Sequence, residues 1–288
     1  MDYIEFRAKL VERITSMTTE GEEVRLSQIN KNNGIVLDGL NVRIPGCNVG
    51  PTLYVEEIKE RFDRMKSGSE EENLSEIAKE ILGICREKAA ANTELAEKLM
   101  DYGNLRDKIC FRLINRERNR VRLQDMPFRP VLDLAMIYYY STDTICGLHG
   151  TIQLKNTDLE RWGIAESELF RDAMHNTPLL EPLLSKPMIE DDEEFGLRIF
   201  TNQSFVNGAA VMLYEGAFSE YAEKWQRDLI ILPSSIHEVL ALPDTGLRSM
   251  QEMRNMVREV NATVVEDTEV LSDEVYVWEY GSGEIRIA

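Results

Sequence analysis

The stretch Asp228–Asp244, DLIILPSSIHEVLALPD, combines a buried-strand pattern with two serines, a histidine and a glutamate at its turn. Ser235-Ile-His-Glu238 fits a capping box, in which the serine opens a helix and the glutamate bonds back to it. The same residues also fit a nucleophile and base, with Ser234 or Ser235 activated by His237. No G-x-S-x-G elbow surrounds either serine, so we favour the helix cap and keep hydrolase chemistry as the alternative.

A weak internal similarity supports the cap. Gly150–Met174 aligns with Asp228–Met253, placing Thr157 over Ser235, and both segments read as strand, short capped helix and longer helix. Apolar strand-like runs, AMIYYY and AAVMLY, lie upstream of the two copies. The alignment predicts internal strand-short helix-long helix repeats, and it places His237 on a predicted inward face.

Periodicity along the chain indicates an α+β protein with a mixed sheet and helices. Tyr3, Phe6, Leu10 and Ile14 mark one face of a first helix. VRLSQI and GIVLDGLNVRI read as strands around the turn Asn32-Asn33-Gly34, Lys66–Asn73 reads as a polar loop, and a helix is expected from about residue 75. The second half brings further strand patterns and closes on a hairpin, EVYVWEY-GSG-EIRIA. We expect a helix-rich portion with a β-hairpin over residues 1–104 and an α+β portion over 105–288.

The composition limits the cellular compartment in which we expect the protein. At 288 residues and 43% hydrophobic content the chain can bury substantial cores. No stretch approaches the ~20 apolar residues that span a bilayer, and the first residues lack a signal-peptide pattern. We therefore expect a cytoplasmic protein that does not contact membranes. Its four cysteines, Cys47, Cys85, Cys110 and Cys146, are widely spaced, which indicates reduced thiols.

The charge distribution is uneven. Eight basic and three acidic residues lie between Arg106 and Arg129, so this strip carries +5 and the rest of the −18 chain carries −23. Such an acidic chain is a poor ligand for nucleic acid. The strip predicts either a partner-binding surface or arginines paired internally with the surplus carboxylates. The candidate partner-binding residues are Arg112, Arg116, Arg118, Arg120 and Arg122.

Metal and cofactor signals are weak. Cys146-Gly-Leu-His149 has the spacing of half a zinc site, but no second close Cys/His pair completes it. The acidic runs Glu70–Glu72 and Glu190–Glu194 lack the alternating ligands of a calcium loop. The P-loop, dinucleotide-binding and H-E-x-x-H motifs are absent from the sequence, so we expect no cofactor.

Several phrases carry a resemblance to a known family: NNGIVLDGL, GPTLYVEEI, INRERN, DLAMIYYY, GAAVMLY, ILPSSIHEV and VLSDEVYVWEY. Together they resemble an uncharacterised bacterial family of unknown function common in anaerobic Firmicutes, over nearly the whole chain. The resemblance implies a bacterial cytoplasmic protein and supplies neither an activity nor catalytic residues.

The sequence is therefore consistent with two functions. The first is a non-catalytic, acidic interaction or regulatory protein that acts on a macromolecular partner, most simply another protein. The alternative is a small hydrolase that uses Ser234 or Ser235 with His237. A buried, hydrogen-bonded His237 would favour the first, and a pocket converging on the serines and His237 would favour the second.

Overall fold

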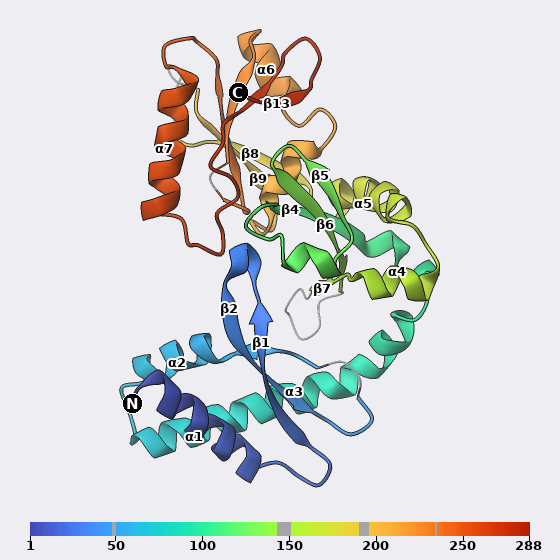
Figure 1. The fold of residues 1–288 in the computed structure, drawn as a ribbon, viewed down its shortest axis with the longest axis vertical. Coiled ribbons are helices and arrows are strands. Elements are labelled where there is room, and N and C mark those ends of the chain that lie inside the picture. The colour runs from blue at the N-terminus through green and yellow to red at the C-terminus, as the bar shows by residue number, and fades with distance from the viewer. Residues whose placement is uncertain (48–49, 143–150, 190–195, 234) are drawn as a thin grey trace. The chain divides into compact units, whose positions relative to one another are not determined.

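The computed structural model describes residues 1–47, 50–142, 151–189, 196–233 and 235–288, apart from the side chains of residue 88 and residues 90–98. The chain forms two compact units, drawn in Figure 1. Among the described residues, unit 1 holds 1–31 and 36–104, and unit 2 holds 32–35, 105–142, 151–189, 196–233 and 235–288. The α+β class expected from periodicity is confirmed, since helices accompany three separate sheets.

Unit 1 packs helices against a small antiparallel sheet. Helix α1 (Tyr3–Ser16) starts at Asp2, whose carboxylate accepts the N–H of Glu5 at 2.8 Å. Its predicted apolar face is confirmed, because Phe6, Leu10 and Ile14 are all fully buried. Strand β1 (Glu23–Asn30) pairs with β2 (Val36–Arg43), and β2 pairs with the short β3 (Leu53–Tyr54). The two predicted strands around the Asn32-Asn33-Gly34 turn are thus confirmed.

Two further helices complete the core of unit 1. Helix α2 (Val55–Arg64) buries Val55 and Phe62. Helix α3 (Glu70–Lys98) begins earlier than expected, within the predicted polar loop. Ser69 explains the early start, because its N–H and hydroxyl both bond to the Glu72 carboxylate, at 2.8 and 3.0 Å. Cys85 is 1% exposed in this core.

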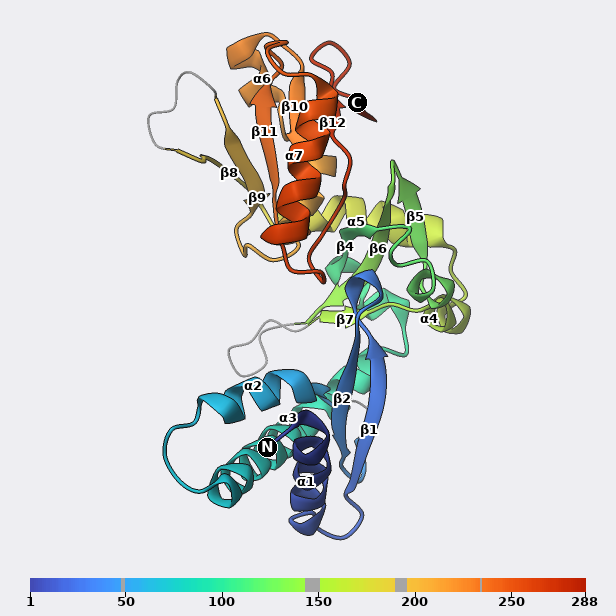
Figure 2. The ribbon, with the colours of Figure 1, turned by 60° about the vertical axis from the view of Figure 1, so that its left-hand side comes forward.

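The larger sheet of unit 2 has six strands in the order β13-β12-β10-β11-β9-β8. Their bounds are β8 (Leu183–Pro187), β9 (Arg198–Asn202), β10 (Leu229–Leu232), β11 (Val239–Pro243), β12 (Tyr276–Trp278) and β13 (Ile285–Ile287). Helix α7 (Met250–Thr263) lies along one face of the sheet (Figure 2). Its Met253 and Val257 pack on Ile230. Strand alternation sends Leu229 and Ile231 to the opposite face. There Phe200 lies 4.7 Å from Phe218, between their ring centroids.

The smaller sheet of unit 2 is built around β6 (Leu134–Ser141). The other three strands, β4 (Ile109–Asn115), β5 (Phe128–Val131) and β7 (Thr151–Gln153), each pair with β6. Helix α4 (Asn156–Trp162) follows β7, and helix α5 (Glu166–Leu180) then packs against β4. The Phe111 N–H donates to Thr177 Oγ1 at 3.0 Å, which fixes α5 to this strand. The remaining described helical segments of unit 2 include η4 (Arg122–Asp125), η5 (Gly208–Leu213) and α6 (Ser219–Trp225). Every strand pair in the described chain is antiparallel, so the sheets are antiparallel rather than mixed.

The predicted helix at Ser235 is wrong. Asp228–Asp244 forms the β10–β11 hairpin, with Ile230 opposite Leu242. The Ser235 hydroxyl accepts the N–H of His237, only two residues on, at 3.0 Å. That bond closes a local turn, which serine side chains favour as readily as a helix cap, and the alternating residues after the turn pair as a strand.

The internal repeat is not confirmed. Strand β7 leads into α4 and α5, whereas β10 leads into β11 and then α7. Thr157 lies inside α4, which begins after Lys155, and Asp158 accepts the Lys155 N–H at 2.9 Å. The run Ala209–Tyr214, expected as a strand, is instead largely the 3-10 helix η5. A short apolar run buried on all sides has no period that separates strand from buried helix.

Candidate functional site

Both ring nitrogens of His237 are engaged. Nδ1 accepts the backbone N–H of Asn207 at 3.2 Å. Nε2 lies 3.2 Å from Glu269 Oε1. Because Nδ1 accepts, a neutral ring carries its proton on Nε2 and donates it to Glu269. His237 therefore bridges the β10–β11 turn, the segment before η5 and the segment after α7.

The backbone around His237 is held as firmly as its ring. Thr201 Oγ1 donates to the His237 carbonyl at 2.7 Å. The Ile236 N–H donates to the Glu269 carbonyl at 2.8 Å, and the Ile236 carbonyl accepts the Ala209 N–H at 3.1 Å. These bonds join three segments that are distant in the sequence. The turn is a structural junction at the end of the sheet.

The catalytic candidates Ser235 and His237 are not arranged as a nucleophile and its base. Ser235 is 9% exposed, and its hydroxyl bonds to the backbone N–H of His237, not to the ring. A general base needs a ring nitrogen within hydrogen-bond reach of the nucleophile, and both are committed to Asn207 and Glu269. Ser234 lies outside the described residues.

His237 supports an exposed bend that the sequence interpretation missed. Phe205 and Val206 are 50% and 54% exposed. Phe205 and Asn207 both have left-handed backbone, with φ of 58° and 54°. Asn202 anchors the bend, because its side-chain amide donates to the Val206 carbonyl at 2.8 Å. We call residues 204–207 the Phe205 bend.

The residue that follows the bend has to be glycine. A Cβ on Gly208 would collide with Thr201 Oγ1 and the His237 carbonyl, and would lie 2.8 Å from the Asn202 backbone nitrogen. The dipeptide Asn207-Gly208 is itself a turn signal that could have located the bend. The pairing of His237 with Glu269, 32 positions away, has no such signal.

The arginine strip has mixed surroundings. Arg118 pairs with Asp273 at 2.8 Å and Arg120 with Glu117 at 3.7 Å. Arg116 is exposed and makes no ion pair within the described chain. Part of the strip is therefore paired internally, and a partner-binding role for its exposed members stays a prediction.

Arg112 and Arg122 are the less exposed members of the strip. Arg112 on β4 donates to Gln153 Oε1 at 2.6 Å and lies over the Tyr139 ring, 5.5 Å from its centroid. Burial, and secondarily the neighbouring charge of Arg122, lowers the pKa of Arg112 to about 10. Arg122 is partly buried on η4. Arg112 is thus an internal cation, held by Gln153 and Tyr139 and close to the like charge of Arg122.

The metal candidates Cys146 and His149 lie outside the described residues, as does the acidic run Glu190–Glu194. Within the described part of the chain, no three histidine, cysteine or carboxylate side chains converge as metal ligands. Cys47, Cys85 and Cys110 form no disulfide bond among the described residues.

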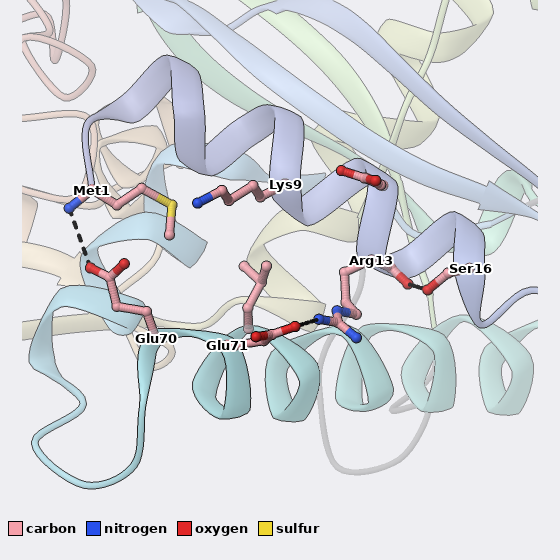
Figure 3. A pocket seen from close by; sticks show the side chains of 8 residues that line it. Met1, Lys9, Arg13, Ser16, Glu70 and Glu71 are labelled. Carbon is pink, nitrogen blue, oxygen red and sulfur yellow. Dashed lines mark hydrogen bonds and ion pairs between the residues drawn. The ribbon is translucent and has the colours of Figure 1, made fainter.

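A charged pocket lies between α1 and α3 in unit 1 (Figure 3). Most of its ionic groups are paired: Arg13 pairs with Glu71 at 2.7 Å, and the amino group of Met1 lies 3.4 Å from Glu70. Lys9 pairs with Glu5, also at 2.7 Å. Exposed pairs of this kind contribute ~0–1 kcal/mol each. Within the described residues, the lining charge without an ion pair is the Glu12 carboxylate, so the pocket offers no unpaired cation to an anionic ligand.

Comparison with known proteins gives a family but no activity. The model of a family of unknown function (DUF5688) matches residues 3–280. The chain belongs to that family, so the expected membership of an uncharacterised family is confirmed. Neither the curated proteins nor the solved structures gave a significant match. None of the helices in the described part of the chain is both long and apolar enough to cross a membrane.

Proposed function

We propose that this chain is a non-catalytic interaction protein that presents the Phe205 bend to a macromolecular partner. The observation that carries the proposal is the combination of exposure and strain at Phe205, which is half exposed with a φ of 58°. Left-handed backbone at a bulky residue costs ~1–3 kcal/mol and persists only where the surroundings enforce it. Here Asn202, His237 and Gly208 enforce it.

The bend has the chemistry of an interface anchor. Aromatic side chains are enriched at the centres of protein interfaces, where they bury a large area at little entropic cost. Val206 adds a second exposed apolar side chain, and the Lys186 ammonium lies 5.3 Å from the Phe205 ring centroid. A preorganised loop loses less conformational entropy on binding than a flexible one. These features support recognition of another protein.

Charge points to the kind of partner. With a net charge of −18, the chain attracts a basic partner over long range. We therefore expect association to weaken as ionic strength rises from ~50 to ~300 mM. Arg116 and Arg120, both exposed, remain candidate contacts for acidic groups of that partner.

The test is quantitative capture of a partner by the full chain. Phe205→Ser combined with Val206→Ser should abolish capture of a protein that the parent retains at low salt. Leu179→Ser is the matched control, because Leu179 is also exposed, at 66%, but lies on α5 away from the bend in sequence. Equal capture by the double variant and the parent would contradict the proposal.

The hydrolase alternative makes a different prediction. It requires turnover of an ester or peptide substrate that is lost in both Ser235→Ala and His237→Ala while the fold is retained. Such a result would replace the interaction proposal, because the His237 ring would then have to leave its partners during the reaction.

A further inference from the structure

A second, independent feature of unit 2 is an apolar cavity beside α7. Its volume is about 360 Å³. Strands β10 and β11 form its floor, and α7 and the loop from Asp244 to Arg248 form its sides. The apolar lining residues are Ile189, Leu197, Ile230, Leu232, Leu242, Pro243, Leu247, Met253 and Met256.

The lining is incompletely covered. Leu247 is 83% exposed, Ile189 61% and Met256 41%, so large apolar side chains border the opening. Methionine side chains are flexible and polarisable, and they adapt to apolar ligands of varied shape. The methionine side chains of the cavity wall can therefore adjust to the shape of an aliphatic chain.

Among the residues that the structure describes, the charged side chains that line the cavity are Asp244 and Arg248. Asp244 is committed to its own loop, because its Oδ1 accepts the N–H of Gly246 at 3.0 Å. Arg248 is exposed and makes no salt bridge within the described residues. Its neighbour Glu252 is occupied by the Ser249 N–H and hydroxyl, at 2.8 and 2.9 Å. Among the described residues, the rim thus presents the Arg248 guanidinium without a direct ion pair, and the Asp244 carboxylate beside it remains an anion that turns toward its own loop. The Arg248 charge also contributes to lowering the pKa of Glu252.

We propose that this cavity binds a small aliphatic carboxylate, with its chain against Leu242 and Met253 and its carboxylate at Arg248. The volume lies at the lower end of the ~300–1,000 Å³ range of small-molecule sites. An amphipathic helix from a partner would need anchor positions along several turns, which a cavity of this size does not provide. A guanidinium and a carboxylate match in charge and in hydrogen-bond geometry. This inference does not depend on the Phe205 bend.

Calorimetric titration of the full chain with octanoate tests the proposal, with octanol and butyrate as comparison ligands. We expect saturable octanoate binding that is at least tenfold tighter than octanol binding, because octanol lacks the charge. Each methylene removed should weaken binding roughly fourfold, so butyrate should bind far more weakly. Failure of octanoate to saturate, or equal affinities for octanoate and octanol, would overturn the proposal.

Variants at exposed positions separate binding from folding. Arg248→Gln should reduce octanoate affinity about tenfold and leave octanol affinity unchanged. Met256→Glu should abolish octanoate binding, since it places a like charge at the cavity wall. Arg258→Gln on α7, whose guanidinium pairs with Glu274 at 3.6 Å, is the matched control and should change neither affinity. Octanoate affinity that is unchanged in Arg248→Gln would contradict the assignment.

Discussion

The backbone N–H of Asn207 donates to Nδ1 of His237 at 3.2 Å, so a histidine in one hairpin sets the conformation of a bend 30 positions earlier in the chain. The same ring reaches Glu269 through Nε2. His237 thereby joins three segments. We expect its removal to change the conformation of the Phe205 bend rather than the turnover of a substrate.

Replacement of His237 should therefore lower stability in a graded way. His237→Ala removes both ring bonds and should reduce the free energy of unfolding by about 2 kcal/mol. His237→Asn keeps an acceptor near the Nδ1 position and should lose about half as much. Ser235→Ala should lose about 1 kcal/mol with its bond to the His237 N–H. Chemical denaturation measures all three, and equal stability of His237→Ala and the parent would refute the junction.

Two glycines give a matched pair with opposite expected signs. Gly208→Ala should destabilise by more than about 3 kcal/mol, since its Cβ meets the backbone of His237 and Asn202. Gly83→Ala lies on α3, where an added Cβ meets nothing within 4 Å, and should stabilise by about 0.5–1 kcal/mol. Thermal unfolding of the two variants compares them directly. A tolerated Gly208→Ala would show that the bend can shift.

The buried hydroxyl of Tyr276 donates its hydrogen bond to the Asp133 carboxylate. Tyr276 is fully buried and donates to Asp133 Oδ1 at 2.7 Å, while Ser272 donates to Asp133 Oδ2 at 2.6 Å. Burial, together with the Asp133 charge, raises the pKa of Tyr276, so its hydroxyl stays protonated as a donor. Asp133→Ala should cost about 3 kcal/mol by leaving that donor unpaired, more than the roughly 1 kcal/mol for Tyr276→Phe.

A control and a coupling test accompany this prediction. Tyr280→Phe removes an exposed hydroxyl that bonds to Glu223 at 2.8 Å, and should change stability by less than about 0.5 kcal/mol. In a double-mutant cycle, the Asp133 and Tyr276 substitutions should be strongly non-additive. Additive losses would mean that the two residues stabilise the fold separately.

Glu22 makes the stability of unit 1 depend on acid pH. The Arg86 guanidinium bonds to both Glu22 oxygens, at 2.8 and 2.7 Å, and with the Thr19 N–H it lowers the pKa of Glu22 to about 2. A carboxyl with a lowered folded pKa stabilises the fold above its unfolded pKa. That contribution disappears as pH falls from about 4.5 to about 2. Because Arg86 is partly exposed, we expect only about 1–2 kcal/mol.

Denaturation of the parent and Glu22→Gln across this pH range measures the contribution. The variant should be less stable than the parent at pH 7, and the difference should vanish near pH 2. Glu57→Gln, an exposed position on α2, should follow the parent at every pH. A difference between parent and Glu22→Gln that persists unchanged at pH 2 would exclude the ion pair as its cause.

The sequence alone predicted those elements whose interacting residues lie near one another in the chain. The spacing of Phe6, Leu10 and Ile14 predicted α1 because a helix repeats its face every 3.6 residues. The Asn33-Gly34 turn predicted the β1–β2 hairpin because those residues tolerate left-handed backbone. The family's phrases and the α+β class were likewise visible in the sequence alone.

Tertiary structure decided what the sequence left ambiguous. Ser235-x-x-Glu238 carries the residues of a helix cap and of a turn, and only the pairing of β10 with β11 selects the turn. The roles of His237 and Phe205 depend on Asn207, Gly208 and Glu269. Hydrogen bonds between segments so far apart have no local period or spacing to reveal them, so these residues gain their roles only when the folded sheet brings their backbones together.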